Sequence, residues 1–346
     1  MRHCCMSGKA PDPGAMTRKP GDLPVRDAYH LRIRGGAVVL RRFLALILPL
    51  LLLGCGRAPA APVHPNPSVS TFPLSILDDT GRTVAIPHLP QRIVSVTLGT
   101  DEILTGLVAP SRIVGVTKYA SDPVESWIAD KVAGTAQIAS ANAEQILALK
   151  PDLIFVASYT APGVVDQLSA SGIPVIEFKD FASAADIENH ILTMGRAVGN
   201  LAGAEAMVST MKSQLAAVAA KVGSLPPVDI LYYTPDGYVF GKNTTPDELI
   251  GDAGAVNVAD AAGITDWKQI SLEAVAAMKP AWLLTDQSQP GFAGKLLANP
   301  ALAAVPAIAD HHVLALPDRD LSTVSQYFSQ AVQAVATALH PSAFGK

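Results

Sequence analysis

Two pairs of neighbouring carboxylates are the side chains whose spacing could support acid–base chemistry. They are Asp101 with Glu102, and Asp318 with Asp320. Two carboxylates can serve as general acid and general base when their environments separate their pKa values. Each pair also has an ordinary explanation, as acids at a helix start or in a loop. The sequence has no Gly-x-Ser-x-Gly motif, no phosphate-binding loop and no Rossmann glycine fingerprint, so it favours a protein that is not an enzyme.

Cysteine and histidine are arranged in a way that does not predict a metal site. Cys4, Cys5 and Cys55 all lie near the start, so the rest of the chain can form neither a disulfide nor a cysteine-based zinc site. The histidines beyond residue 55 lack the spacing of metal ligands and are expected to be ordinary surface or core residues: His64, His88, His190, His311, His312 and His340.

Two glutamates occupy matched positions in a repeated unit of short helix, proline and strand. Glu144 precedes Lys150-Pro151 by the same spacing as Glu273 precedes Lys279-Pro280, and an apolar run follows each proline. Proline ends the helix because it has no N–H to donate and restricts the residue before it. A single repeat at about 130 residues favours two similar lobes over a solenoid, whose repeats span roughly 20–50 residues. Such units are also common in α/β proteins, but the matched Glu, Lys and Pro favour a true duplication.

The elements that must position these residues alternate between strand and helix. Apolar runs at 92–96, 112–116 and 153–157 have the length and composition of parallel strands covered on both faces. Residues 201–222 place apolar side chains at spacings of three and four, which predicts an amphipathic helix about 33 Å long. The pattern predicts an α/β protein with two doubly wound lobes joined by a single long helix.

The first 71 residues have a different composition. Arg41 and Arg42 precede an apolar run at 43–53, which is typical of a secretory signal and short for a membrane span. The run closes with Gly54-Cys55, which resembles a bacterial lipoprotein signal in which the cysteine carries the lipid. The alternative is a short membrane anchor with an incidental cysteine. We therefore expect a protein that is exported by the general or the twin-arginine secretion route and is held on the membrane by a lipid on Cys55.

Composition and charge complete the domain organisation. Residues 1–54 contain nine of the 26 Lys and Arg residues and three of the 30 Asp and Glu residues. Residues 55–346 therefore hold 17 basic and 27 acidic residues, a net charge of −10. An acidic body argues against nucleic acid as a partner. The expected divisions are a leader and lipoprotein signal at 1–54, a proline-rich tether at 55–71, an N-terminal lobe at 72–198, a connecting helix at 199–223 and a C-terminal lobe at 224–346.

Taken together, these segments resemble the substrate-binding lipoproteins of ABC importers for ferric siderophores, cobalamin and haem. The resemblance covers about 90–346 and is carried by residues 92–95, 113–116, 144–152, 167–174, 240–245, 266–280 and 316–319. It implies a monomer with a ligand cleft between the lobes and no intrinsic cofactor. It also implies that Glu144 and Glu273 dock on arginines of a permease dimer. The alternative for both glutamates is a favourable interaction with a helix dipole.

The resemblance also implies which residues contact the ligand. Trp267 and Tyr119 match aromatic cleft positions, and Arg319 lies on a loop that reaches the ligand in relatives. Tyr159, Tyr233 and Tyr238 fall beside the cleft, where packing is an equally good explanation for any one tyrosine. Ile138 replaces the second aromatic residue of a cobalamin sandwich.

The expected ligand is therefore a metal chelate, a ferric siderophore first and cobalamin next. Alternatives are a haem-binding transport protein, with Tyr119 or Tyr159 as the haem ligand, and a surface receptor or sensor with the same cleft and no permease.

Overall fold

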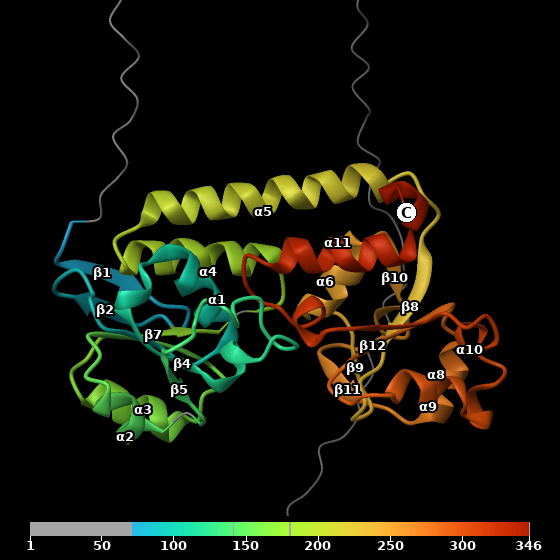
Figure 1. Cartoon of the computed structure of the whole chain (residues 1–346), viewed down its shortest axis with the longest axis horizontal. Helices are drawn as coiled ribbons and strands as arrows, with labels where there is room; N and C mark the ends of the chain where they lie inside the picture. Colours follow the sequence, from blue (N-terminus) through green and yellow to red (C-terminus); the bar gives the residue numbers. More distant parts are fainter. Residues whose placement is uncertain (1–70, 141, 180, 346) are drawn as a thin grey trace, which may run out of the picture. The chain divides into compact units, whose positions relative to one another are not determined.

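The computed structural model describes residues 71–140, 142–179 and 181–345. The described residues all belong to one compact unit, Val63–Lys346. The expected leader and Cys55 lie outside the described residues. The described elements form two α/β lobes, the N-lobe (residues 71–198) and the C-lobe (residues 224–345), which confirms the predicted fold class (Figure 1).

The N-lobe is built around a parallel sheet with strand order β5-β4-β3-β6-β7. Alternate residues of β6 point to opposite faces, because successive side chains of a strand do so. Leu153 and Phe155 join the core under α1 and α4, whereas Ile154 and Val156 join the core under α2 and α3. The elements are β1 (Leu74–Leu77), β2 (Thr83–Ile86), β3 (Ile93–Ser95), α1 (Leu98–Leu107), β4 (Ile113–Thr117), β5 (Ala136–Ile138), α2 (Ala143–Ala148), β6 (Leu153–Ala157), α3 (Pro162–Ala170), β7 (Val175–Phe178) and α4 (Ala184–Ala197).

The C-lobe has a parallel sheet with strand order β10-β8-β12-β13, the order of β4-β3-β6-β7 in the N-lobe. A separate antiparallel pair, β9 and β11, lies beside it. The elements are β8 (Val228–Tyr232), β9 (Tyr238–Phe240), α6 (Thr245–Asp252), β10 (Ala255–Asn257), α7 (Val258–Ala261), β11 (Trp267–Gln269), α8 (Leu272–Met278), β12 (Trp282–Asp286), α9 (Phe292–Leu297), α10 (Pro306–Ala309), β13 (Val313–Leu316) and α11 (Phe328–Leu339).

The repeated unit has the same local structure in both lobes. Helices α2 and α8 begin at side-chain caps, Asn142 and Ser271, each of which accepts a hydrogen bond from the backbone N–H three residues later. Lys150 and Lys279 both adopt φ 49, a left-handed conformation that ends the helix before proline. A central strand follows each proline, β6 in one lobe and β12 in the other. These shared features, with the shared strand order, support the predicted duplication.

Helix α5 (Leu201–Val222) runs past both lobes and occupies the range expected from its apolar spacing (Figure 1). Met211, Val218 and Val222 are buried against α4 and α11, in a core that continues from one lobe to the other. Across 71–345, leaving aside positions 141 and 180, no helix has both the length and the hydrophobicity that a membrane span requires.

A second connection between the lobes is made by hydrogen bonds. The carboxylate of Glu102, on α1, accepts from the backbone N–H of Trp127 (2.9 Å) and from the hydroxyls of Thr323 (3.2 Å) and Ser325 (2.6 Å). Glu102 is 1% exposed, so these bonds satisfy a carboxylate that water does not reach. The C-lobe segment that precedes α11 is thereby attached to the N-lobe.

Candidate functional site

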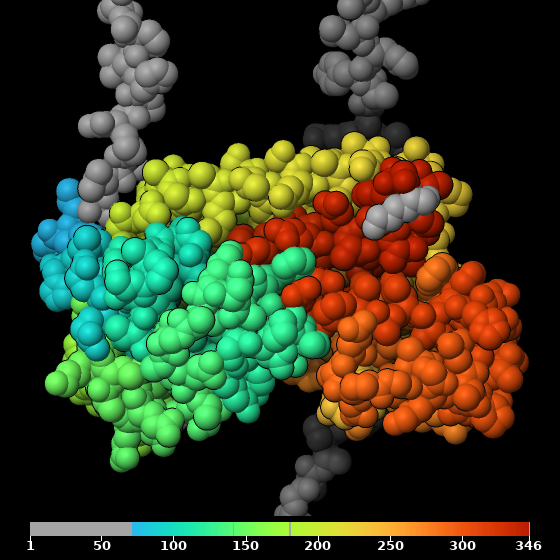
Figure 2. Space-filling view, viewed as in Figure 1, coloured from blue at the N-terminus to red at the C-terminus, as the bar shows by residue number. Residues whose placement is uncertain are grey.

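Three adjoining hollows lie between the lobes, with volumes of about 800, 370 and 120 Å³. The two larger hollows share Phe240, Trp267 and Ser322, and the smallest shares Tyr159 and Ser322 with the largest. They therefore form one cleft with walls from both lobes. Figure 2 shows the surface hollowed between the lobes on the side away from α5.

Two exposed aromatic side chains from opposite lobes line the largest hollow. Trp267, on β11, is 68% exposed, and Tyr159, just after β6, is 66% exposed. Phe181 lies 5.7 Å from Tyr159, measured between ring centroids, and extends the apolar wall of the N-lobe. Large aromatic surfaces left open to water in a concave site are well suited to bind a flat apolar ligand. Ile138 is buried and does not belong to the described lining of this hollow, whereas Tyr159 does.

The hydroxyl of Tyr159 is in a different environment from its exposed ring. Desolvation raises its pKa, a hydrogen bond with Thr97 opposes that change, and the charge of Asp101 adds to it. Asp101 itself is fully buried, and this burial raises its pKa to about 8, although it accepts hydrogen bonds from Thr117. Tyr159 is therefore a neutral phenol at neutral pH, with its hydroxyl desolvated beside Thr97 and its ring exposed in the cleft.

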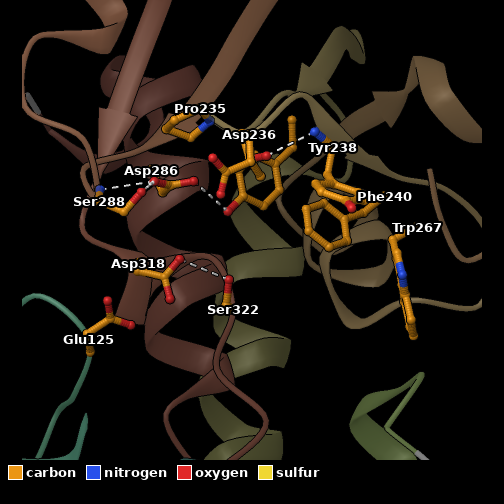
Figure 3. Close-up of a pocket in the computed structure, with 12 residues that line it drawn as sticks. Glu125, Pro235, Asp236, Tyr238, Phe240, Trp267, Asp286, Ser288, Asp318 and Ser322 are labelled. Atoms are coloured by element: carbon orange, nitrogen blue, oxygen red, sulfur yellow. Dashed lines mark hydrogen bonds between the residues drawn. The ribbon is translucent and has the colours of Figure 1, made fainter. Parts of the chain in front are cut away.

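Carboxylates gather in the 370 Å³ hollow. Glu125 comes from an N-lobe loop, Asp286 from the end of β12, and Asp318 from the 3-10 turn after β13. In Figure 3, Asp318 lies between Glu125 and Asp286. Burial raises the pKa of Asp318 to about 7, and the charges of Glu125 and Asp286 add to this effect. Asp236 lines the same hollow.

The expected ligand residues are placed differently from one another. Trp267, Tyr159 and Tyr238 line the cleft, with Tyr238 in the smaller acidic hollow. Tyr119 is 49% exposed with the Lys118 ammonium 5.0 Å from its ring centroid, and it is absent from the described linings of the three hollows.

Tyr233 and Arg319 are occupied elsewhere. Tyr233 is buried in the C-lobe core, where its ring stacks on Phe292. The Arg319 guanidinium donates to the carbonyl of Pro123 (2.7 Å) and lies 4.7 Å from the ring centroid of Trp127, so it joins the lobes. Neither residue belongs to the described lining of the hollows.

Several lining residues were not identified from sequence. They are Glu125, Tyr232, Phe240, Asp286 and Asp318, the last considered only as part of a carboxylate pair. A sequence signal existed for Asp286, because a polar residue at the carboxyl end of a buried parallel strand lies where α/β folds bind ligands. Asp318 and Tyr232 are each adjacent in sequence to a predicted ligand residue.

The matched glutamates lie outside the cleft. Glu144 and Glu273 are exposed in the first turns of α2 and α8. Hydrogen bonds with Ser271 and with its own backbone lower the pKa of Glu273. Helices α2 and α8 lie in different lobes, both on the side away from α5 (Figure 1). Two acidic groups are thus presented on one side of the protein.

The described residues hold no cluster of three or more histidine, cysteine or acidic side chains that could bind a metal ion. His190 is buried and pairs with Asp79, with 2.9 Å between Nε2 and the carboxylate oxygen. The expected lipid site, Cys55, lies outside the described residues.

Comparison with known proteins gives consistent matches over most of the chain. A family model described as "Periplasmic binding protein" matches residues 93–319. The uncharacterized ABC transporter substrate-binding lipoprotein YvrC of Bacillus subtilis (strain 168) is 27% identical over 311 residues, which cover 86% of this chain and 96% of YvrC. A cobalamin-binding protein of Halobacterium salinarum is 26% identical over 261 residues, 71% of this chain and 69% of that protein. The solved structure of the periplasmic heme-binding protein RhuT from Roseiflexus sp. RS-1 superposes with a TM-score of 0.64 at 27% identity, covering 73% of this chain and 99% of RhuT.

Proposed function

Because the chain belongs to the periplasmic binding protein family, we propose that it captures a metal chelate between its lobes and delivers it to an ABC permease. The relatives named above are solute-binding proteins and not enzymes. The family is extracytoplasmic, which agrees with the secretory pattern of residues 41–55. The observation that carries the proposal is the pair of exposed aromatic side chains, Trp267 and Tyr159, which come from different lobes and line the same hollow.

The shape and chemistry of the walls favour a flat macrocyclic chelate. A planar ligand between Trp267 and Tyr159 would cover both rings and remove their apolar surface from water. One relative is a cobalamin-binding protein, and cobalamin contains such a macrocycle. We therefore place cobalamin ahead of a ferric siderophore, which reverses the order expected from sequence. Haem is the alternative macrocycle, with Tyr159 as the candidate iron ligand in the cleft.

Delivery would use the two matched glutamates. Glu144 and Glu273 are exposed, lie in equivalent helices of the two lobes and belong to the side of the protein away from α5. Arginine binds carboxylates through a planar fork of donors, so a permease dimer with two arginine clusters would match two such corners. We propose that a lipid on Cys55 keeps the protein at the membrane that holds the permease.

The test is a binding screen with residues 63–346, which form one compact unit. Cyanocobalamin, haemin, a ferric trihydroxamate and a ferric tricatecholate are titrated separately by isothermal calorimetry, with absorption spectra recorded at saturation. We expect cyanocobalamin to bind with a one-to-one stoichiometry and to quench tryptophan fluorescence, since Trp267 lines the cleft. If none of the four chelates binds, the proposed function is wrong.

A further inference from the structure

The 370 Å³ hollow is lined both by carboxylates from the two lobes and by aromatic rings. Glu125 belongs to the N-lobe, whereas Asp286 and Asp318 belong to the C-lobe. Tyr232, Tyr238, Phe240 and Trp267 line the same space. The exposed Trp267 and Tyr238 independently mark this space as a place for a ligand, because exposed rings in a cavity gain from being covered.

The described lining of this hollow includes no lysine or arginine to balance its negative charge. None of the salt bridges between described residues includes Glu125, Asp236, Asp286 or Asp318. Arg319 is next to Asp318 in sequence, but its guanidinium lies against Pro123 and Trp127. Carboxylates held close together without a counter-charge disfavour the ionised form. Burial raises the pKa of Asp318 to about 7, and the charges of Glu125 and Asp286 add to this effect.

Some acceptor positions are already used, and others remain for a ligand. One Asp286 oxygen accepts from the backbone N–H of Ser288 (3.0 Å), and the other lies 3.4 Å from the Tyr232 hydroxyl. One Asp318 oxygen accepts from the Ser322 hydroxyl at 3.2 Å. Figure 3 shows the second oxygen of Asp318 on the side of Glu125, and a hydrogen bond between these two carboxyl groups is one of the effects that raise the pKa of Asp318. This bond needs a proton on one of the two carboxyl groups. Once both are ionised, a donor group placed between the lobes would find acceptors from both.

The aromatic rings reinforce this preference for positive charge. The face of an aromatic ring carries partial negative charge and attracts ammonium and similar groups. Tyr232 and Phe240 stack with centroids 4.9 Å apart at the wall of the hollow. The adjoining 800 Å³ hollow is lined instead by Lys179, Asn243, Thr244 and Thr245 together with its aromatic residues. The two parts of the cleft therefore suit different parts of one ligand.

We infer that Glu125, Asp286 and Asp318 determine ligand specificity by receiving a nitrogen-bearing arm of the chelate, either a cationic ammonium or a primary amide, while its macrocycle or metal centre occupies the larger hollow. The same carboxylates reject chelates that place a carboxylate or another anion in this position, because like charges at close range cost several kcal/mol. This inference rests on the proposed function and defines the class of solute as neutral or cationic.

The experiment compares ligands that differ in one charge. Cyanocobalamin is tested against its monocarboxylic acids, in each of which one amide arm has been hydrolysed. Ferrioxamine B, which has a free ammonium arm, is tested against its N-acetylated derivative. Affinities are measured at pH 8 with residues 63–346, for the wild-type protein and for the double variant Glu125→Gln/Asp318→Asn. The matched control is Glu205→Gln/Asp310→Asn, which removes the same two kinds of charge from exposed positions outside the cleft.

We expect the wild-type protein to bind the amide or ammonium member of at least one pair about tenfold or more tightly than its partner, since one hydrogen bond to a charged group is worth about 1.5–3 kcal/mol. The double variant should reduce this ratio to about threefold or less, and the control should leave it unchanged. The ratio is insensitive to partial misfolding, because both ligands are measured on the same sample.

Binding without discrimination in the wild-type protein, or an undiminished ratio in the double variant, would overturn the inference and leave the proposed function standing. Absence of binding to every chelate would overturn both.

Discussion

Replacing Trp267 by alanine should weaken ligand binding and leave the fold intact. A tryptophan side chain can bury about 250 Å², and Trp267 is 68% exposed, so about 170 Å² is available to a ligand. A planar chelate covers one of the two ring faces, about 85 Å², which at ~25 cal/mol per Å² is worth about 2 kcal/mol. The expected loss of affinity is about 30-fold. Isothermal calorimetry with the chelate that binds most tightly measures it directly.

Leu77→Ala provides the matched control for this prediction. Leu77 is also 68% exposed, but it lies on β1 and outside the three hollows. Both variants should change the free energy of unfolding in urea by at most about 0.5 kcal/mol, because neither side chain is in the core. A change in affinity below about threefold for Trp267→Ala, or an equal change for Leu77→Ala, would refute the assignment of Trp267 to the binding wall.

Three further predictions concern docking, pH and the contact between the lobes. Glu144→Arg/Glu273→Arg should abolish import of labelled ligand into cells while leaving the affinity for ligand within about twofold; import at the wild-type rate would contradict docking and favour a receptor or sensor. The folded protein keeps a proton on Asp101 up to pH 8 that the unfolded chain loses near pH 3.8, so wild-type stability falls as pH rises through this window. The free energy of unfolding of Asp101→Asn minus that of the wild type should therefore rise by up to about 1.4 kcal/mol per pH unit and level off above pH 8. If this difference, measured by urea titration, stays constant between pH 5 and 8, Asp101 does not keep its proton in the folded protein. Glu102→Ala should lower the free energy of unfolding by about 3 kcal/mol, because it leaves the Trp127 N–H without its buried acceptor, and should accelerate hydrogen exchange in residues 318–327; unaltered exchange there would count against the second interlobe connection.

Features with local signals could be predicted from the sequence. The helix–proline–strand unit depends on a cap, a Lys-Pro pair and an apolar run, all within about 15 residues, and Lys150 and Lys279 adopt the same backbone conformation in the structure. Helix α5 could be predicted because its apolar spacing continues without proline over its whole length. Such signals identify elements and their order, and the order was enough to indicate two similar lobes.

The lining of the cleft could not be predicted to the residue. Tyr232 and Tyr233 point to opposite faces of the sheet, so choosing between them needs the register of β8 to one residue. Asp318 and Arg319 are neighbours in one tight turn, so choosing between them needs the conformation of that turn. This second difference concerns charge, because the described lining of the cleft includes the Asp318 carboxylate and not the Arg319 guanidinium. Glu125 had no local signal, because its role depends on a contact with the other lobe.

A crystal structure of residues 63–346 grown with saturating cyanocobalamin would test the central claim most directly. We predict that the ligand lies between the lobes with its macrocycle covering Trp267 and Tyr159 and an amide arm within hydrogen-bond distance of Asp318. Ligand bound outside the cleft, or a cleft left empty at saturating concentration, would contradict the account.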